Sequence, residues 1–237
     1  MPQLVPHHFL SELNQRSGTD YEYNEEAFKR SRLALSVEKA VQLLCLQALR
    51  WASNKTHENL LKGNGKRAID VGSAYGYVAS MLNWFKYESV AIDISKYALM
   101  AGKNVGRIQG DAQNLPFKHD SVDIITCFDT LEHLNQPNLL LEGSYRCLRK
   151  RGVLLVENPV QSPIDIISDR LHKMKDIHCS LLSPSGLMSL ARRVGFYTDA
   201  KGLLPIPFQR FPLFGRFVEM RVPIPMARRV LILATKN

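Results

Sequence analysis

Three acidic residues follow apolar runs of strand-like composition, and their side chains could bind a nucleoside. Asp70 and Asp93 close the runs "RAID" and "SVAID", and Asp111 follows "RIQG". The carboxyl ends of parallel strands meet at one edge of a sheet, where an acid commonly accepts hydrogen bonds from ribose hydroxyls. These acids therefore indicate a nucleoside site along one sheet edge.

The turn after the first acid, "DVGSAYGY", resembles a nucleotide-binding loop without its phosphate cradle. A dinucleotide fingerprint G-x-G-x-x-G that began at Gly72 would need glycines where the chain has Ala74 and Tyr77. Those glycines normally bring the backbone close to a pyrophosphate. The turn contains only the glycines Gly72 and Gly76 and so lacks the three-glycine phosphate cradle. We therefore expect the ligand to be an adenosine that carries something other than phosphates.

Each of these residues also has a purely structural interpretation. A glycine turn can simply reverse the chain, Asp93 can be favoured by a helix N-terminus, and Asp111 can start an Asx turn. We prefer the nucleoside site because coincidence explains three acids at consecutive strand ends much less easily.

A second group of reactive residues lies in "FDTLEHLNQP". One helical turn could bring together the side chains of Asp129, Glu132 and His133, which are of the types that bind a divalent ion such as Mg²⁺. His133 could instead act as a metal-free base or contact a substrate. It could also only hydrogen-bond the loop backbone beside Pro137.

The elements that must position these residues are predicted by alternating apolar and amphipathic runs. Strands are expected near 67–71, 89–94, 106–110, 122–128 and 152–157, helices near 76–86, 95–104 and 137–149, a helix between Ser183 and Gly195, and closing strands at 197–204 and 228–235. This order is typical of an α/β protein with a doubly wound, mostly parallel sheet.

Residues 1–62 are predicted to form a leader and a helical cap or lid, and 63–237 the ligand-binding domain. With 237 residues, 45% of them hydrophobic, the chain can bury one sizeable core. Four cysteines without a C-x-x-C pair argue against a zinc site or disulfide framework and fit a reducing cytoplasm. We expect a cytoplasmic protein, because neither a signal peptide nor an apolar membrane-spanning run is present.

The segment 201–237 is basic and rich in phenylalanine and proline, and it carries +6 of the net charge of +9. Phenylalanines recur at every third position from Phe208 to Phe217, with arginines beside them. Such a surface suits peripheral contact with an anionic membrane or the wall of a pocket for a lipid-like acceptor. Alternatively, the phenylalanines pack under the sheet or at a dimer contact while the arginines stay solvated.

Taken in order, five segments between residues 66 and 200 resemble the motifs of class I S-adenosylmethionine-dependent methyltransferases: "DVGSAYGY", "AIDIS", "GDAQNLPF", "VDIITCFDTLEHL" and "RCLRKRGVLLVENP". The resemblance implies a seven-stranded Rossmann-like sheet and S-adenosylmethionine as cofactor. It places Asp93 on the ribose and Asp111 and Ala112 at the adenine. The cofactor-binding residues it implies are Asp70, Gly72, Gly76, Asp93, Ile94, Asp111, Ala112 and Phe128.

The segment around His133 is similar to ubiquinone-pathway O-methyltransferases and small-RNA 2′-O-methyltransferases, in which Glu-x-x-Glu-His binds a divalent ion. Here the first acid is Asp129, one methylene shorter. The resemblance also implies a catalytic role for His178, although that histidine could equally cap the helix after it.

We therefore expect O-methylation of a small-molecule, lipid-like or glycan acceptor. The alternatives are RNA 2′-O-methylation and a catalytically silent subunit that binds a partner. Nucleic acid is disfavoured because no RNA-binding module is recognisable, and the oligomeric state is not predicted.

Overall fold

The structure is a computed structural model that describes residues 35–160, 182–207, 217–224, 227 and 229–237. In chain order the elements are α3 (Leu35–Thr56), β1 (Arg67–Val71), α4 (Tyr77–Trp84), β2 (Glu88–Asp93), α5 (Lys96–Ala101), β3 (Gly106–Gln109), β4 (Val122–Phe128), η1 (Leu131–His133), α6 (Pro137–Cys147), β5 (Leu148–Pro159), α8 (Pro184–Val194), β6 (Tyr197–Pro207), β7 (Phe217–Val222) and β8 (Arg229–Thr235).

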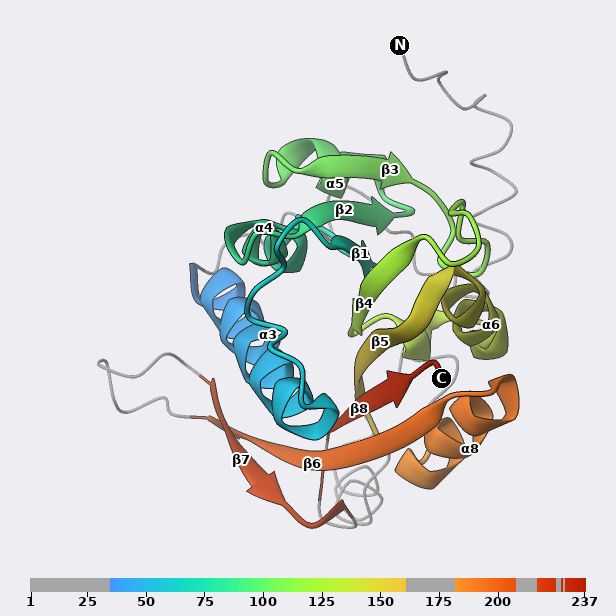
Figure 1. The fold of residues 1–237 in the computed structure, drawn as a ribbon. Coiled ribbons are helices and arrows are strands. Elements are labelled where there is room, and N and C mark those ends of the chain that lie inside the picture. The colour runs from blue at the N-terminus through green and yellow to red at the C-terminus, as the bar shows by residue number, and fades with distance from the viewer. Residues whose placement is uncertain (1–34, 161–181, 208–216, 225–226, 228) are drawn as a thin grey trace.

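The strands form one sheet in the order β3-β2-β1-β4-β5-β8-β6-β7 (Figure 1). Strands β1 to β5 pair in parallel, whereas β8 pairs antiparallel with both β5 and β6. The predicted seven-stranded, mostly parallel fold is thus confirmed, with one further strand at the edge.

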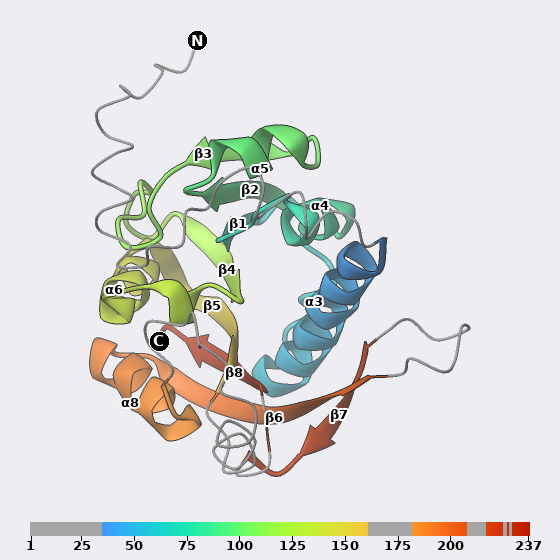
Figure 2. The ribbon, with the colours of Figure 1, turned by 180° about the vertical axis from the view of Figure 1, so that it is seen from behind.

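That further strand, β7, was not predicted from the sequence. It pairs antiparallel with the end of β6, from Gly202 opposite Val222 to Pro207 opposite Phe217. Beyond Leu203, β6 pairs with β7 alone, and Pro205 and Pro207 lie in this part. Proline is tolerated there because this extension lies at the sheet edge. Figure 2 shows the hairpin from behind.

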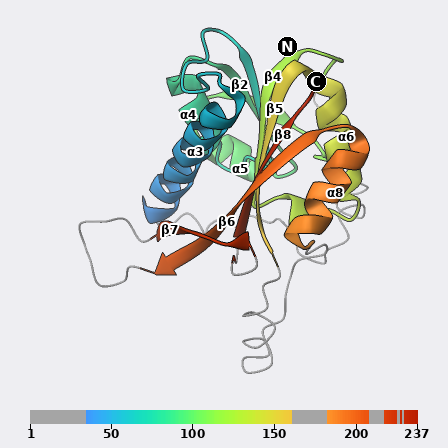
Figure 3. The same ribbon diagram turned by 60° about the horizontal axis from the view of Figure 1, so that its bottom comes forward.

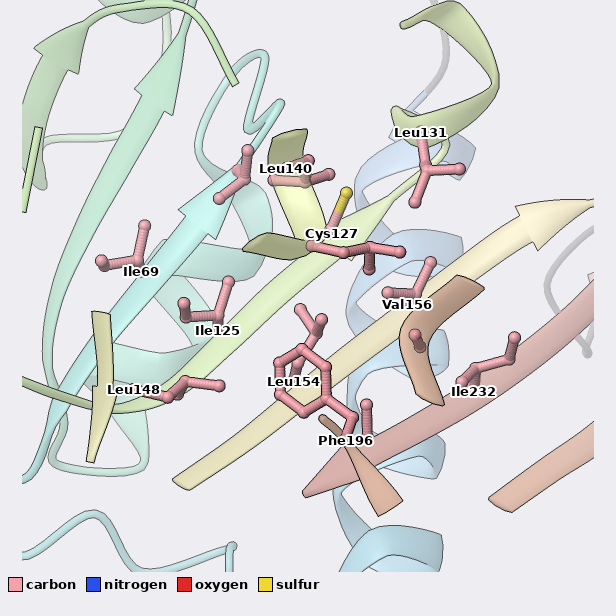
Figure 4. Close-up of a cluster of buried hydrophobic side chains, with 14 of the residues drawn as sticks. Ile69, Ile125, Cys127, Leu131, Leu140, Leu148, Leu154, Val156, Phe196 and Ile232 are labelled. Atoms are coloured by element: carbon pink, nitrogen blue, oxygen red, sulfur yellow. The ribbon is translucent and has the colours of Figure 1, made fainter. Parts of the chain in front are cut away.

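Helices cover both faces of the sheet, with α3 and α4 on one side and α6 and α8 on the other (Figure 3). Between the sheet and α6 and α8 lies a cluster of buried side chains that includes Ile125, Leu140 and Leu154, each at most 1% exposed (Figure 4). Burial of each such side chain stabilises the fold by about 2 kcal/mol. The site therefore stands on a well-packed core.

The predicted helix between Ser183 and Gly195 is confirmed as α8, and local chemistry explains its bounds. The Ser183 hydroxyl accepts a hydrogen bond from the Gly186 N–H at 3.1 Å. Gly195 ends the helix with φ of 117°, a left-handed conformation that glycine adopts without a steric penalty.

Helix α3 packs into the core of the domain. Its Ala48, Leu49 and Ala52 are fully buried and belong to one cluster with Leu155 of β5 and Leu82 of α4. This part of the predicted cap is therefore integral to the fold.

Several predictions fall outside the described residues. They are the leader and the start of the cap, His178, and most of the phenylalanines of 201–237. The segment 201–237 does supply the end of β6 and all of β7 and β8. Within the part of the chain that the structure describes, no helix is long and apolar enough to cross a membrane.

Candidate functional site

The chain reverses direction after β1 through three residues with left-handed backbone. Gly72, Ala74 and Gly76 have φ of 68°, 45° and 69°. A Cβ on Gly72 would lie 2.0 Å from the Thr130 Oγ1, so only glycine fits there. Ala74 tolerates its conformation, which costs roughly 1 kcal/mol, with its N–H bonded to Asp93.

Asp93 holds this turn from the end of β2. Its carboxylate accepts hydrogen bonds from the N–H of Ala74 at 2.7 Å and of Ser95 at 2.8 Å. Burial raises the pKa of Asp93, and these backbone N–H groups oppose that rise. Since a carboxylate has about four acceptor positions, Asp93 keeps capacity to accept from a ribose hydroxyl.

A pocket opens beside the turn at the carboxyl ends of β1, β2, β3 and β4. It is lined by Gly72, Ala74, Ile92, Asp93, Ile94, Gly110, Asp111, Ala112, Gln113, Asp129, Thr130, His133 and Leu134. Five of the eight residues predicted to bind the cofactor are in this lining. A few polar groups within apolar walls suit an adenosine.

Gln113 is a pocket residue that the sequence analysis missed. Its N–H donates to the Asp111 Oδ1 at 2.8 Å, an Asx turn, and its Oε1 accepts from the Gln136 N–H at 2.9 Å. It therefore links the loop after β3 to the start of α6. Its polar type inside "GDAQNLPF" was the only signal available.

The other three predicted cofactor residues support the site without lining the pocket. Asp70 is 3% exposed and accepts a hydrogen bond from the Thr126 Oγ1 at 2.8 Å. Gly76 is the N-cap of α4. Phe128 is buried, and its carbonyl accepts from the Thr130 Oγ1 at 3.0 Å. These residues shape the turn and the end of β4.

The buried Asp70 predicts a pH-dependent stability. Burial raises its pKa from the ordinary 3.8 to about 7, although a hydrogen bond from Thr126 lowers it. The folded state thus keeps a proton that the unfolded chain loses near pH 4, so stability falls as pH rises from about 4 to about 7. Asp70→Asn should remove roughly 4 kcal/mol of this pH-dependent loss of stability, as measured by urea unfolding at pH 4 to 8.

Asp120→Asn is the matched control, because the exposed Asp120 carboxyl has a pKa lowered by Lys236. That change should leave the slope between pH 4 and 8 as in the wild type. Identical pH profiles for wild type and Asp70→Asn would contradict the assignment.

In the segment after β4, the three candidate metal ligands Asp129, Glu132 and His133 have different partners. Asp129 has φ of 48°, and its carboxylate is ion-paired with Arg229. Glu132 is 1% exposed, and its Oε1 lies 3.8 Å from the His133 Nε2. Among the described residues, which include all three predicted ligands, no group of three or more His, Cys, Asp or Glu could hold a metal ion. The Asp129 carboxylate turns toward Arg229 instead of joining Glu132 and His133.

His133 and Asp129 nevertheless border the same pocket as the nucleoside-binding residues. His133 is partly exposed, with 21% of its side chain accessible. An imidazole at this position can accept a proton from a group that enters the pocket from outside.

Comparison with known proteins supports this description. Residues 69–156, from β1 to β5, match the family profile of the methyltransferase domain. The methyltransferase YcgJ of Bacillus subtilis is 29% identical over 157 residues, which are 60% of this chain and 62% of that protein. The region from β1 to β5 thus belongs to the S-adenosylmethionine-dependent methyltransferase domain family.

Other members of this family are similar over different shares of the chain. A ubiquinone biosynthesis O-methyltransferase of Paraburkholderia phymatum is 24% identical over 181 residues, 68% of this chain and 76% of that protein. A ubiquinone/menaquinone C-methyltransferase of Vibrio vulnificus matches over 46% of its own length. The aligned region thus spans less than two thirds of the length of YcgJ and of the Vibrio vulnificus protein.

Solved structures of family members share the fold. The crystal structure of YcgJ superposes with a TM-score of 0.61 at 18% identity and covers 81% of this chain and 98% of that one. A methyltransferase from Thermotoga maritima superposes with a TM-score of 0.63 at 24% identity, and the superposition covers 88% of this chain and 95% of that one.

Proposed function

We propose that the chain transfers the methyl group of S-adenosylmethionine to a hydroxyl of a small-molecule, lipid-like or glycan acceptor. The observation that carries this proposal is the pocket in which the Gly72 turn, Asp93 and Asp111 meet at neighbouring strand ends. When bound, S-adenosylmethionine supplies an electrophilic methyl group on a sulfonium.

Some pocket residues would bind the cofactor, and His133 would take part in the chemistry. Asp93 and Asp111 would bind the ribose and the adenine, and the Gly72 turn leaves room for the methionine part. The apolar Ile92 and Leu134 exclude water, which favours direct displacement between aligned groups. His133 would take the proton of the acceptor hydroxyl.

Oxygen is the proposed acceptor atom for two reasons. The Paraburkholderia protein, whose alignment covers 68% of this chain, is named an O-methyltransferase. In addition, a hydroxyl acceptor must lose its proton on transfer, and His133 lines the pocket where that base is needed.

The test combines cofactor binding with a search for the acceptor. Wild-type protein should bind S-adenosylmethionine in calorimetry and transfer a labelled methyl group to a component of a metabolite or lipid extract. Asp93→Asn should weaken binding by about 2 kcal/mol, roughly 30-fold, because an amide cannot accept from both the Ala74 and Ser95 N–H groups.

Asp123→Asn is a control of the same type, since Asp123 accepts from the Arg67 N–H and from Arg149 away from the pocket. Cofactor binding without transfer to any extract would point to a silent subunit. Transfer to RNA alone would overturn the acceptor class.

A further inference from the structure

An ion cluster next to the pocket joins β8 and β5 to the end of β4 and runs from the buried Glu157 to Asp129, whose side chain is 55% exposed. Arg229 opens β8, and both its Nε and its Nη2 donate to the carboxylate of Glu157 on β5, the latter at 2.6 Å. The same Nη2 also donates to the Asp129 carboxylate at the end of β4. Glu157 is fully buried, and the Arg229 side chain is 23% exposed.

This cluster acts on the residue from which the pocket segment 129–134 begins. Asp129 has left-handed backbone, which is costly for a residue with a Cβ. Two contacts hold it, the ion pair with Arg229 and the bond of its N–H to the Glu157 carbonyl at 3.0 Å. Arg229 and Glu157 therefore fix Asp129 from two directions.

The position of Asp129 determines that of the residues after it. Thr130 packs against Gly72 so closely that no Cβ fits between them. The His133 N–H donates to the Thr130 carbonyl at 3.1 Å, so Thr130 also fixes the short η1 helix. Asp129, Thr130, His133 and Leu134 all line the pocket.

We propose that Arg229 is a positioning residue for methyl transfer, whose guanidinium holds segment 129–134 against the pocket through Asp129. This inference rests on the proposed function. The guanidinium serves as a permanent internal cation between two carboxylates, at the place where the family resemblance predicted a metal ion. Its planar fork matches a carboxylate in two parallel hydrogen bonds, which a lysine cannot reproduce.

The other end of the same strand provides a matched control. Lys236, just after β8, donates to the Asp120 Oδ1 and to the Leu148 carbonyl, both at 2.7 Å, and its side chain is 14% exposed. Neither Lys236 nor its partners line the pocket. Loss of this ion pair should therefore change the stability of the protein without changing the pocket.

The experiment compares Arg229→Met, Arg229→Lys and Lys236→Met in the full chain. The rate that is measured is that of labelled methyl transfer to the extract fraction that the wild type methylates. We expect Arg229→Met to slow transfer at least tenfold, Arg229→Lys to retain an intermediate rate, and Lys236→Met to stay within twofold of wild type. Free guanidinium at millimolar concentration should partly restore Arg229→Met and have no effect on Lys236→Met.

A double-mutant cycle separates positioning from general stabilisation. If Arg229 acts through Asp129, Arg229→Met should add less than twofold in the Asp129→Asn background. A full tenfold loss in that background would overturn the proposal. If Arg229→Met alone does not fold, Arg229→Met/Glu157→Gln removes the buried charge as well, and a wild-type rate in this folded variant would also overturn it.

Measurements on the wild-type protein distinguish a refutation of the positioning role from a refutation of the proposed function. A wild-type protein that neither binds S-adenosylmethionine nor transfers methyl would refute the function itself, and the role of Arg229 with it. An active wild type together with an equally active Arg229→Met would refute only the positioning role.

Discussion

Replacing Gly72 by alanine should lower the affinity for S-adenosylmethionine by about 100-fold. The new Cβ would lie 2.0 Å from the Thr130 Oγ1 and 2.4 Å from its Cγ2, and the backbone φ is 68°. Overpacking of this kind costs about 2 kcal/mol and the left-handed backbone about 1 kcal/mol more. The ligand-free turn is expected to relieve this strain by shifting away from Thr130, and cofactor binding must then restore it, which corresponds to roughly 100-fold in affinity. Isothermal calorimetry on folded protein measures the change.

Gly65→Ala separates the two contributions. Gly65 has φ of 76°, and no atom outside its chain neighbours lies within 4 Å of an added Cβ. The substitution therefore imposes backbone strain without a clash, and cofactor affinity should stay within about threefold of wild type. Gly72→Ala/Thr130→Ala should recover part of the affinity by removing the clashing side chain. Equal losses at Gly65 and Gly72 would show that the Thr130 contact does not matter.

His133→Gln should slow methyl transfer by about 100-fold while changing the affinity for S-adenosylmethionine by less than about threefold. Glutamine keeps much of the size of histidine but cannot take a proton near neutral pH, and a positioned base contributes at least about 100-fold. The expected pattern is a fall in kcat with little change in cofactor binding, measured by single-turnover transfer and calorimetry.

His119→Gln is the corresponding control, because His119 is exposed in the loop before β4 and does not line the pocket. Its rate should match the wild type. An unchanged rate for His133→Gln would remove the histidine from the chemistry and leave alignment as the main source of catalysis. Parallel losses of rate and cofactor affinity would instead assign it to binding.

The convergence of Gly72, Asp93 and Asp111 was predictable from the sequence. Each follows a short apolar run, and the alternation with helices requires a parallel sheet whose strand ends share one edge. The bounds of α8 were equally predictable, since Ser183 and Gly195 each form hydrogen bonds with residues three or four positions away in the sequence. Such features depend on local periodicity and turn chemistry, which a sequence displays directly.

The partners of Asp129 could be known only from the tertiary structure. Arg229 lies 100 residues later in the chain, and the antiparallel insertion of β8 between β5 and β6 places it against Glu157. Local spacing suggested that Asp129 would join Glu132 and His133 around a metal ion, but a left-handed backbone turns its carboxylate to the guanidinium instead. Strand register and long-range charge pairing decide the direction of a side chain, and neither is visible in the residues that flank it.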